Sequence, residues 1–289
     1  MAVMVNGELI DDLAIKEEAE RLRPRYDKLF EQMDEKEREE QLLEWSKENL
    51  IEKILLQQDV AKSDLKVTKN QIDTVLFDLK KNCQNEQELY DDFDVDNEDD
   101  LLKKLEIIIQ TQQKLDQINE EAPDPSAADI KKYYEDNKEN FKQPESIRVA
   151  HIVKYYGWQC DEAAAYQKVS QAYEEIQSGL PFESIVDKHS DCADRGGDIG
   201  YIKRGQMVEE FDDVVFNLGV GQVSNIFRTR YGYHIAKVYD RKPTHIPELE
   251  KVKEQIKEIL KKQFQSQAVY NYLDYLKSKA KIEEIKTES

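Results

Sequence analysis

Glycine is confined to the middle of this 289-residue chain. Gly7 is the only glycine before Gly157, nine lie from Gly157 to Gly232, and none follows. Glycine supplies the positive φ angles that turns need and weakens the interior of helices. The distribution therefore predicts a turn-rich middle segment between two helical flanks, in a chain long enough for two domains.

The N-terminal flank carries apolar residues at the three- and four-residue steps of amphipathic helices. Helices are expected over residues 15–33, 42–55, 71–81 and 99–119. Pro24 lies inside the first pattern and is expected to kink or split that helix. Ser126, followed by Asp129, predicts the start of a connecting helix that ends before Pro144.

A long helix is also expected at the C-terminal end, where Val252, Ile256, Leu260, Leu273 and Leu276 share one face. Such a face needs a partner, and the N-terminal bundle is the natural one. Both ends of the chain would then build one helical domain, with the middle inserted between them. The short apolar stretches Met4–Ile10 and Lys281–Ile285 are candidates for pairing at the chain ends.

The middle segment reads as a mixture of strands and short helices. Residues 147–153 and 233–238 have the texture of strands, and helices are expected over 163–178, 182–189 and 208–217. Arg195-Gly196-Gly197-Asp198 has the composition of a turn.

Charge and hydropathy exclude several classes of protein. The formal net charge of −19 disfavours nucleic-acid binding, because so acidic a surface repels phosphate backbones, and it would attract basic client chains. No stretch approaches the roughly 20 apolar residues of a membrane span. The first residues lack the pattern of a signal peptide, so a cytoplasmic location is expected; the alternative is a periplasmic or other extracytoplasmic location after removal of a signal peptide.

Three cysteines, Cys83, Cys160 and Cys192, show neither the even number of a disulfide framework nor the repeated spacing of a zinc site. They favour a reducing compartment. No metal and no cofactor is expected.

Several segments of the middle occur in the order and spacing of the parvulin family, over about 90 residues. They are His151-Ile152-Val153, Phe182–Ile185, His189–Cys192, Gly196–Gly200, Arg204–Met207, Glu210-Phe211, Gly221–Ser224 and Tyr231–Ile235. The middle therefore resembles a parvulin-type peptidyl-prolyl cis–trans isomerase. The flanks resemble, less specifically, the helical chaperone segments of SurA- and PrsA-type foldases, through Val5–Glu8, Tyr133–Asn137 and Phe141.

The resemblance implies an α+β fold, in which a parvulin domain is inserted in an all-helical chaperone domain. The parvulin domain, residues 146–241, would hold a four-stranded, mainly antiparallel sheet with surrounding helices. Residues 1–145 and 242–289 would form the helical domain. The implied function is isomerisation of X–Pro bonds in unfolded or extended client chains by twisting the imide, without a covalent step. A homodimer is possible.

The resemblance also implies the site residues. Ile199, Met207 and Phe211 would form an apolar proline pocket, and His151, Cys192 and His234 would form a polar cluster at the centre of the sheet. If a helix begins early enough, Met207 and Phe211 share one of its faces at i, i+4. The neutral histidines would be linked to each other by hydrogen bonds.

Competing interpretations remain for these residues. Apolar pairs at this spacing are usually core residues, and histidines in strands are often structural. His189 lies near Cys192, but isomerisation needs no nucleophile. Lys154 stands nearly alone after the first strand, so phosphoserine selectivity is not expected. The alternative function is a holdase chaperone whose parvulin domain is weak or inactive and serves for binding.

Overall fold

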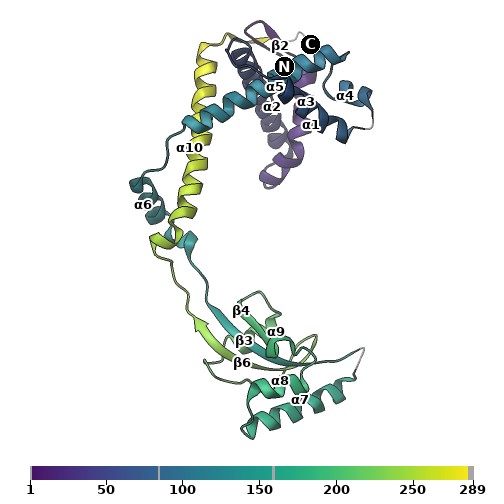
Figure 1. Cartoon of the computed structure of the whole chain (residues 1–289), viewed down its shortest axis with the longest axis vertical. Helices are drawn as coiled ribbons and strands as arrows, with labels where there is room; N and C mark the ends of the chain where they lie inside the picture. The colour runs from purple at the N-terminus through teal and green to yellow at the C-terminus, as the bar shows by residue number, and fades with distance from the viewer. Residues whose placement is uncertain (1, 84, 158–159, 286–289) are drawn as a thin grey trace. The chain divides into compact units, whose positions relative to one another are not determined.

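The computed structural model describes residues 2–83, 85–157 and 160–285 and divides into two compact units. The first, here called the helical unit, combines residues 1–129 with residues 257–289, and the second, the sheet unit, covers residues 130–256 (Figure 1). Each unit is described by itself. Among the described residues no helix is both long and apolar enough to cross a membrane.

Helices from both ends of the chain build the helical unit. They are α1 (Asp12–Leu29), α2 (Glu35–Val60), α3 (Lys69–Asn82), α4 (Glu86–Asp92) and α5 (Glu98–Glu121), joined by most of α10 (Leu249–Lys279). Short polar side chains cap the first turn of α1 to α5: Asp11, Asp34, Thr68, Asn85 and Asn97 each accept a bond from a backbone N–H. The capped starts explain why an acidic, polar segment still forms defined helices.

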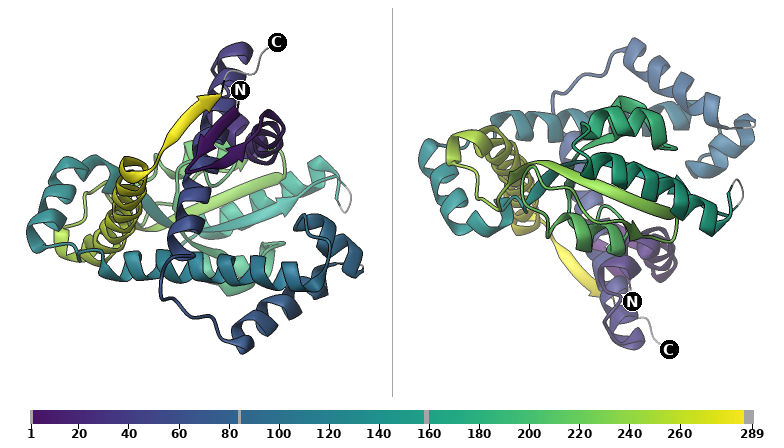
Figure 2. Two further views of the ribbon diagram at one scale, coloured as in Figure 1. Left: turned by 90° about the horizontal axis from the view of Figure 1, so that it is seen from above. Right: turned by 90° about the horizontal axis from the view of Figure 1, so that it is seen from below.

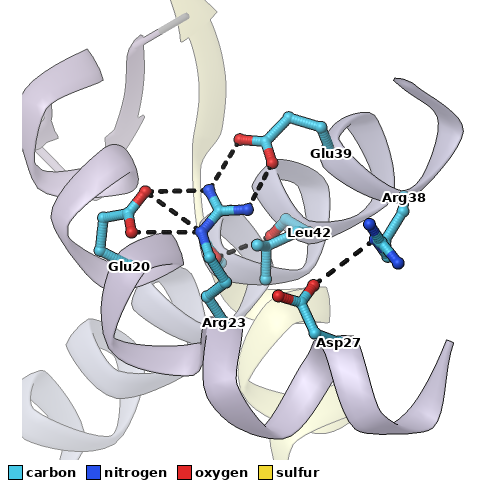
Figure 3. A network of polar contacts seen from close by, with 7 residues as sticks. Glu20, Arg23, Asp27, Arg38, Glu39 and Leu42 are labelled. Atoms are coloured by element: carbon cyan, nitrogen blue, oxygen red, sulfur yellow. Dashed lines mark hydrogen bonds and ion pairs between the residues drawn. The ribbon is translucent and has the colours of Figure 1, made fainter. Parts of the chain in front are cut away.

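Helices α1 and α2 are tied together by an arginine. The Arg23 guanidinium donates to Glu20 on its own helix and, at 2.6 Å and 3.0 Å, to Glu39 on α2, while Arg38 pairs with Asp27 (Figure 3). The predicted split at Pro24 does not occur, since α1 runs unbroken to Leu29. Pro24 is exposed, so water can reach the carbonyl that its missing N–H leaves free.

A three-stranded antiparallel sheet joins the two ends of the chain in this unit. β1 (Ala2–Val5) lies between β2 (Glu8–Ile10) and β7 (Ile282–Ile285), and β1 and β7 lie side by side in Figure 2. The predicted pairing of the terminal stretches is thus confirmed. Asn6 and Gly7 both have positive φ, as a two-residue hairpin turn requires.

The sheet unit is built around two long neighbouring strands. Its strands are β3 (Ser146–Tyr155), β4 (Asp198–Lys203), β5 (Phe227–Arg228) and β6 (Gly232–Lys242), in the antiparallel order β4-β3-β6-β5. Its helices are α6 (Ala127–Asp136), which begins in the preceding unit, α7 (Glu162–Gln177), α8 (Phe182–His189) and α9 (Glu209–Val215), with 3₁₀ turns at Lys138–Phe141 and Asp194–Gly197. The predicted α+β class with a four-stranded antiparallel sheet is confirmed.

Both faces of this sheet are covered. Ala150 and Ile152 of β3 pack with side chains of α7 and α8, whereas Ile147 and Val149 pack with α9; Figure 1 shows α7 and α8 on one side of the sheet. Burial on both faces makes residues 149–153 a continuous buried run.

Several local expectations needed adjustment. Ser126 does cap α6, with its Oγ accepting from Asp129 N at 3.2 Å, but the helix ends at Asp136 and a 3₁₀ turn follows. Strands β4 and β5 and helix α4 were not expected from the residue pattern; the first two are short and depend on pairing with distant strands. Helix α9 begins at Glu209 and ends at Val215, so it is shorter than predicted.

Gly197 is held where no other residue fits. Its φ is +72°, and an added Cβ would lie 2.3 Å from the carbonyl oxygen of His151. Gly197→Ala must therefore move β3 or the turn, and we expect it to destabilise the sheet unit by roughly 3 kcal/mol, the sum of a left-handed backbone penalty and overpacking. Amide hydrogen exchange of β3 and β6 in the full chain measures the loss.

Gly196 offers a matched control. It also has positive φ, +66°, but no atom lies within 4 Å of its added Cβ. Gly196→Ala should carry only the backbone penalty, about 1–2 kcal/mol. Equal effects of the two substitutions would show that close contact with His151 is not what requires glycine.

Candidate active site

A cavity of about 510 Å³ opens beside the centre of the sheet unit. Its wall comes from β3, the loop before α9, α9 itself, the turn between β5 and β6, and β6. The lining residues are His151, Tyr155, Gln206, Met207, Val208, Phe211, Thr229, Arg230, Tyr231 and His234.

The two histidines come together because β3 and β6 are neighbours. His151 pairs with Ala236 and His234 with Val153, so the histidines are diagonal neighbours on one face of the sheet. Their rings stack with centroids 5.5 Å apart. The Phe211 ring meets both edge-on, with its centroid 5.7 Å from each, and Phe227 stacks on His234 at 5.3 Å.

The polar partner of His234 is not the other histidine. Its Nε2 lies 2.9 Å from the Thr229 hydroxyl in a buried hydrogen bond. The buried Nδ1 atoms of both His151 and His234 have no hydrogen-bond partner among the described residues. The rings of the two histidines are therefore stacked, with an angle of 26° between their planes, and the expected hydrogen bond between them is not observed among the described residues.

Burial keeps both histidines neutral. It lowers the pKa of His151 to about 4. Burial also lowers the pKa of His234, to about 3, with a further contribution from His151 beside it. At neutral pH the floor of the cavity therefore carries polar ring nitrogens without charge.

Met207 and Phe211 reach the cavity from different local structures. Phe211 is on the first turn of α9 and is 1% exposed. Met207 precedes Val208, the N-cap of that helix, so the helix does not begin early enough for Met207 and Phe211 to share a helical face. The buried Asp212 instead holds the loop, because its Oδ2 accepts from Gly205 N at 2.5 Å, and Phe211 N donates to Val208 O at 2.9 Å.

Two predicted site residues lie outside the lining. Ile199 on β4 packs against the apolar cluster that contains Phe211 but is not among the residues that line the cavity. Cys192 lies in the segment after α8, where its N–H donates to Ser190 Oγ at 3.2 Å and its carbonyl accepts from that hydroxyl at 2.9 Å. It lies near Tyr155, whose pKa is raised by burial and further by Cys192 and Asp191.

Residue-by-residue reading of the sequence missed Thr229, Arg230 and Tyr155. Thr229 lies five residues before His234, a spacing that brings two side chains together only once the β5–β6 hairpin exists. Arg230 and Tyr231 form the hairpin turn. The motif Tyr231–Ile235 pointed to this region but not to these roles.

This arrangement can hold a compact apolar ring against Met207 and Phe211 and present neutral hydrogen-bonding groups beside it. Within the described ranges, no group of three or more His, Cys, Asp or Glu side chains is placed to hold a metal ion. The geometry suits binding and electrostatic stabilisation of a small apolar group.

Comparison with known proteins agrees with this geometry. Residues 151–240 match the rotamase family described as the PPIC-type PPIASE domain. A foldase protein PrsA of Caldanaerobacter subterraneus is 37% identical over 38% of this chain and 33% of its own. A chaperone SurA of Hahella chejuensis is 29% identical over 48% of this chain and 32% of its own. A parvulin-like PPIase of Rickettsia bellii is 34% identical over 49% and 47%.

These matches cover between about a third and a half of the relatives' own lengths. They confirm the predicted resemblance to parvulins and to SurA- and PrsA-type proteins.

Proposed function

We propose that this chain, whose residues 151–240 form a PPIC-type parvulin domain, is a peptidyl-prolyl cis–trans isomerase and foldase that acts on X–Pro bonds of unfolded clients. The observation that carries the proposal is the cavity in which Met207 and Phe211 lie beside the stacked pair of neutral histidines. An enzyme for this reaction must hold the proline ring and stabilise a twisted imide. Met207 and Phe211 suit the first requirement, and the neutral histidines suit the second.

The reaction is rotation about the imide bond, with a barrier of roughly 18–20 kcal/mol. In the twisted state amide resonance is lost. The lone pair is then localised on the imide nitrogen, and the carbonyl oxygen loses part of its negative charge. Groups that suit this redistribution better than they suit the planar imide lower the barrier. Removal from water strengthens such interactions, and no bond is made or broken.

We assign the roles as follows. Met207 and Phe211 grip the proline ring, and Ile199 supports Phe211 from behind. His151 and His234, with Thr229, provide a neutral polar floor. Cys192 shapes the polar surroundings of Tyr155 rather than attacking the substrate, since it is not among the lining residues.

We propose that the helical unit binds unfolded clients. In support, a hollow of about 420 Å³ in this unit has a lining that is mainly apolar and aromatic, made by Tyr26, Leu29, Phe30 and Trp45 together with Gln41, Glu44 and Glu48. Leu29 and Trp45 are 62% and 40% exposed. Neighbouring exposed apolar side chains of this kind are typical of surfaces that bind apolar segments of another chain. We keep the extracytoplasmic location as the alternative, because the relatives include a foldase PrsA and a chaperone SurA, the two groups whose resemblance suggests that location.

Met207→Ala tests the isomerase proposal with little risk to folding, because Met207 is only half-buried. Loss of one apolar wall should lower kcat/KM for a proline peptide by roughly tenfold, the value of a few methylene contacts. A chymotrypsin-coupled assay at micromolar enzyme measures it. Wild-type rates equal to the uncatalysed rate would refute the catalytic claim.

The holdase alternative is separated by a second measurement on the same variant. Suppression of client aggregation should be unchanged in Met207→Ala, because the hollow of the helical unit is untouched. A wild type that suppresses aggregation but shows no isomerisation would establish the holdase function instead.

A further inference from the structure

Among the residues that the structure describes, one side chain with a permanent charge lines the candidate active site. Arg230 lines the cavity together with the apolar residues, and no aspartate or glutamate is among the lining residues. Both histidines of the wall are neutral at pH 7 because they are buried. The one formal charge on the lining is therefore positive, although the whole chain carries a net charge of −19.

Arg230 differs from the basic residues around it. Lys154 pairs with Asp191 at 2.5 Å, and Arg228 pairs with Glu162 at 3.0 Å. Within the described part of the chain Arg230 has no carboxylate partner, and its guanidinium lies 5.1 Å from the Tyr231 ring centre. An unpaired guanidinium in a chain this acidic is free to bind an incoming anion.

The backbone that carries Arg230 is held firmly. Thr229 N donates to Gly232 O at 2.9 Å, closing the turn between β5 and β6. The Thr229 hydroxyl bonds His234 and accepts from Tyr231 N at 3.1 Å. The Tyr156 hydroxyl donates to Thr229 O at 3.0 Å. The turn is thus tied to the floor of the cavity, and the base of the Arg230 side chain has a defined place in its wall.

We propose that Arg230 selects prolines that have an acidic residue, aspartate or glutamate, immediately beside them in the client chain. Neighbouring Cα atoms are about 3.8 Å apart, so a side chain next to a proline held by Met207 and Phe211 meets another part of the same cavity wall. This inference rests on the proposed isomerase function. It concerns a single carboxylate, because a lone arginine is a poorer match for a doubly charged phosphate than a basic cluster is.

Peptides that differ only in one residue next to proline test the selection. Rates of cis–trans exchange are measured by NMR exchange spectroscopy with the full chain, for Glu and Gln placed before or after proline. We expect glutamate to be favoured over the isosteric glutamine by about two- to fivefold at one of these positions, as for a partly exposed ion pair. The preference should weaken as salt rises, because the pair is accessible to solvent.

Three variants decide what causes the preference. Arg230→Gln should bring the glutamate-to-glutamine ratio to about one, and Arg230→Lys should retain most of it. Arg228→Gln is the matched control. It also removes one arginine charge, but Arg228 lies two residues before Arg230 and is not among the residues that line the cavity. Arg230 is exposed, so these substitutions should leave the fold intact.

The outcomes are distinguishable. The inference is wrong, while the isomerase function stands, if Arg230→Gln still catalyses exchange above the uncatalysed rate and keeps the wild-type glutamate-to-glutamine ratio. The same conclusion follows if Arg228→Gln also brings that ratio to one. A phosphoserine peptide that exceeds the glutamate peptide by tenfold or more would replace the carboxylate by phosphate as the ligand. No acceleration for any peptide, including Ala-Pro, would overturn the isomerase function and this inference together.

Discussion

Phe211→Ala is expected to abolish isomerase activity and to destabilise the sheet unit. Phe211 is 1% exposed, packs in the apolar cluster of β3, β6 and α9, and touches both histidine rings edge-on. Truncating a buried phenylalanine costs about 3–5 kcal/mol through lost burial and the cavity left behind. Hydrogen exchange of β3 and β6 amides measures the loss of stability, and the peptide assay measures the loss of activity.

Phe216→Ala separates these two effects. Phe216 belongs to the same cluster and is 5% exposed, but it does not line the cavity. It should lower stability by a comparable amount while the folded molecules keep their kcat/KM. Phe211→Leu, which keeps most of the apolar volume, should fold and still be slower. If Phe216→Ala and Phe211→Leu lose activity in proportion to stability alone, Phe211 is a core residue without a role in binding proline.

Acidification is expected to weaken the sheet unit well before its carboxylates titrate. The histidines have pKa values of about 4 for His151 and about 3 for His234 in the folded chain, below the ordinary histidine value of 6.5. As the pH falls below about 6.5, His151 and His234 bind protons in the unfolded chain but stay unprotonated in the folded chain. The contribution of the two neutral histidines to the free energy of unfolding is therefore fully present above this pH, and it is lost as the pH falls towards the folded pKa values.

The expected loss by pH 5 is on the order of 2 kcal/mol for each histidine, because each pH unit in this window is worth about 1.4 kcal/mol. Hydrogen exchange of the β3 and β6 amides at pH 7, 6 and 5, corrected for intrinsic rates, measures the slope. His151→Gln should remove about half of it. Ring-proton signals give a direct reading: if those of His151 and His234 shift with a midpoint near 6.5, the rings are not desolvated and the prediction is wrong.

Much of the fold followed from local patterns. Periodicity placed α3, α5 and α7 within two residues of their observed ends, because a helix repeats over many turns, whereas α2 extends well beyond the expected range at both ends. The short elements were not predicted. Strand β5, for example, is two residues long and is defined by its pairing with β6, in which Phe227 lies opposite His234. The boundaries of the parvulin domain at 146 and 241 stay a prediction, as do the roles of the site residues.

The candidate site was predicted in part. The order of motifs led to His151, Met207, Phe211 and His234, all of which line one cavity. It did not reveal that Met207 precedes its helix, because a helix start without a side-chain cap, as at Val208, leaves little trace in the sequence. Nor did it reveal Thr229 as the partner of His234.

The sequence alone determined that helical flanks surround a glycine-rich α+β segment, and that this segment carries the parvulin motifs in order. Those features depend on periodicity, on turn chemistry and on spacing, which are properties of neighbouring residues. The tertiary structure decided that the histidines are stacked and neutral and that Cys192 lies outside the lining of the cavity. It also decided that Arg230 lines the cavity without a carboxylate partner among the described residues. Burial and partners depend on contacts between distant segments, and only the folded sheet brings those segments together.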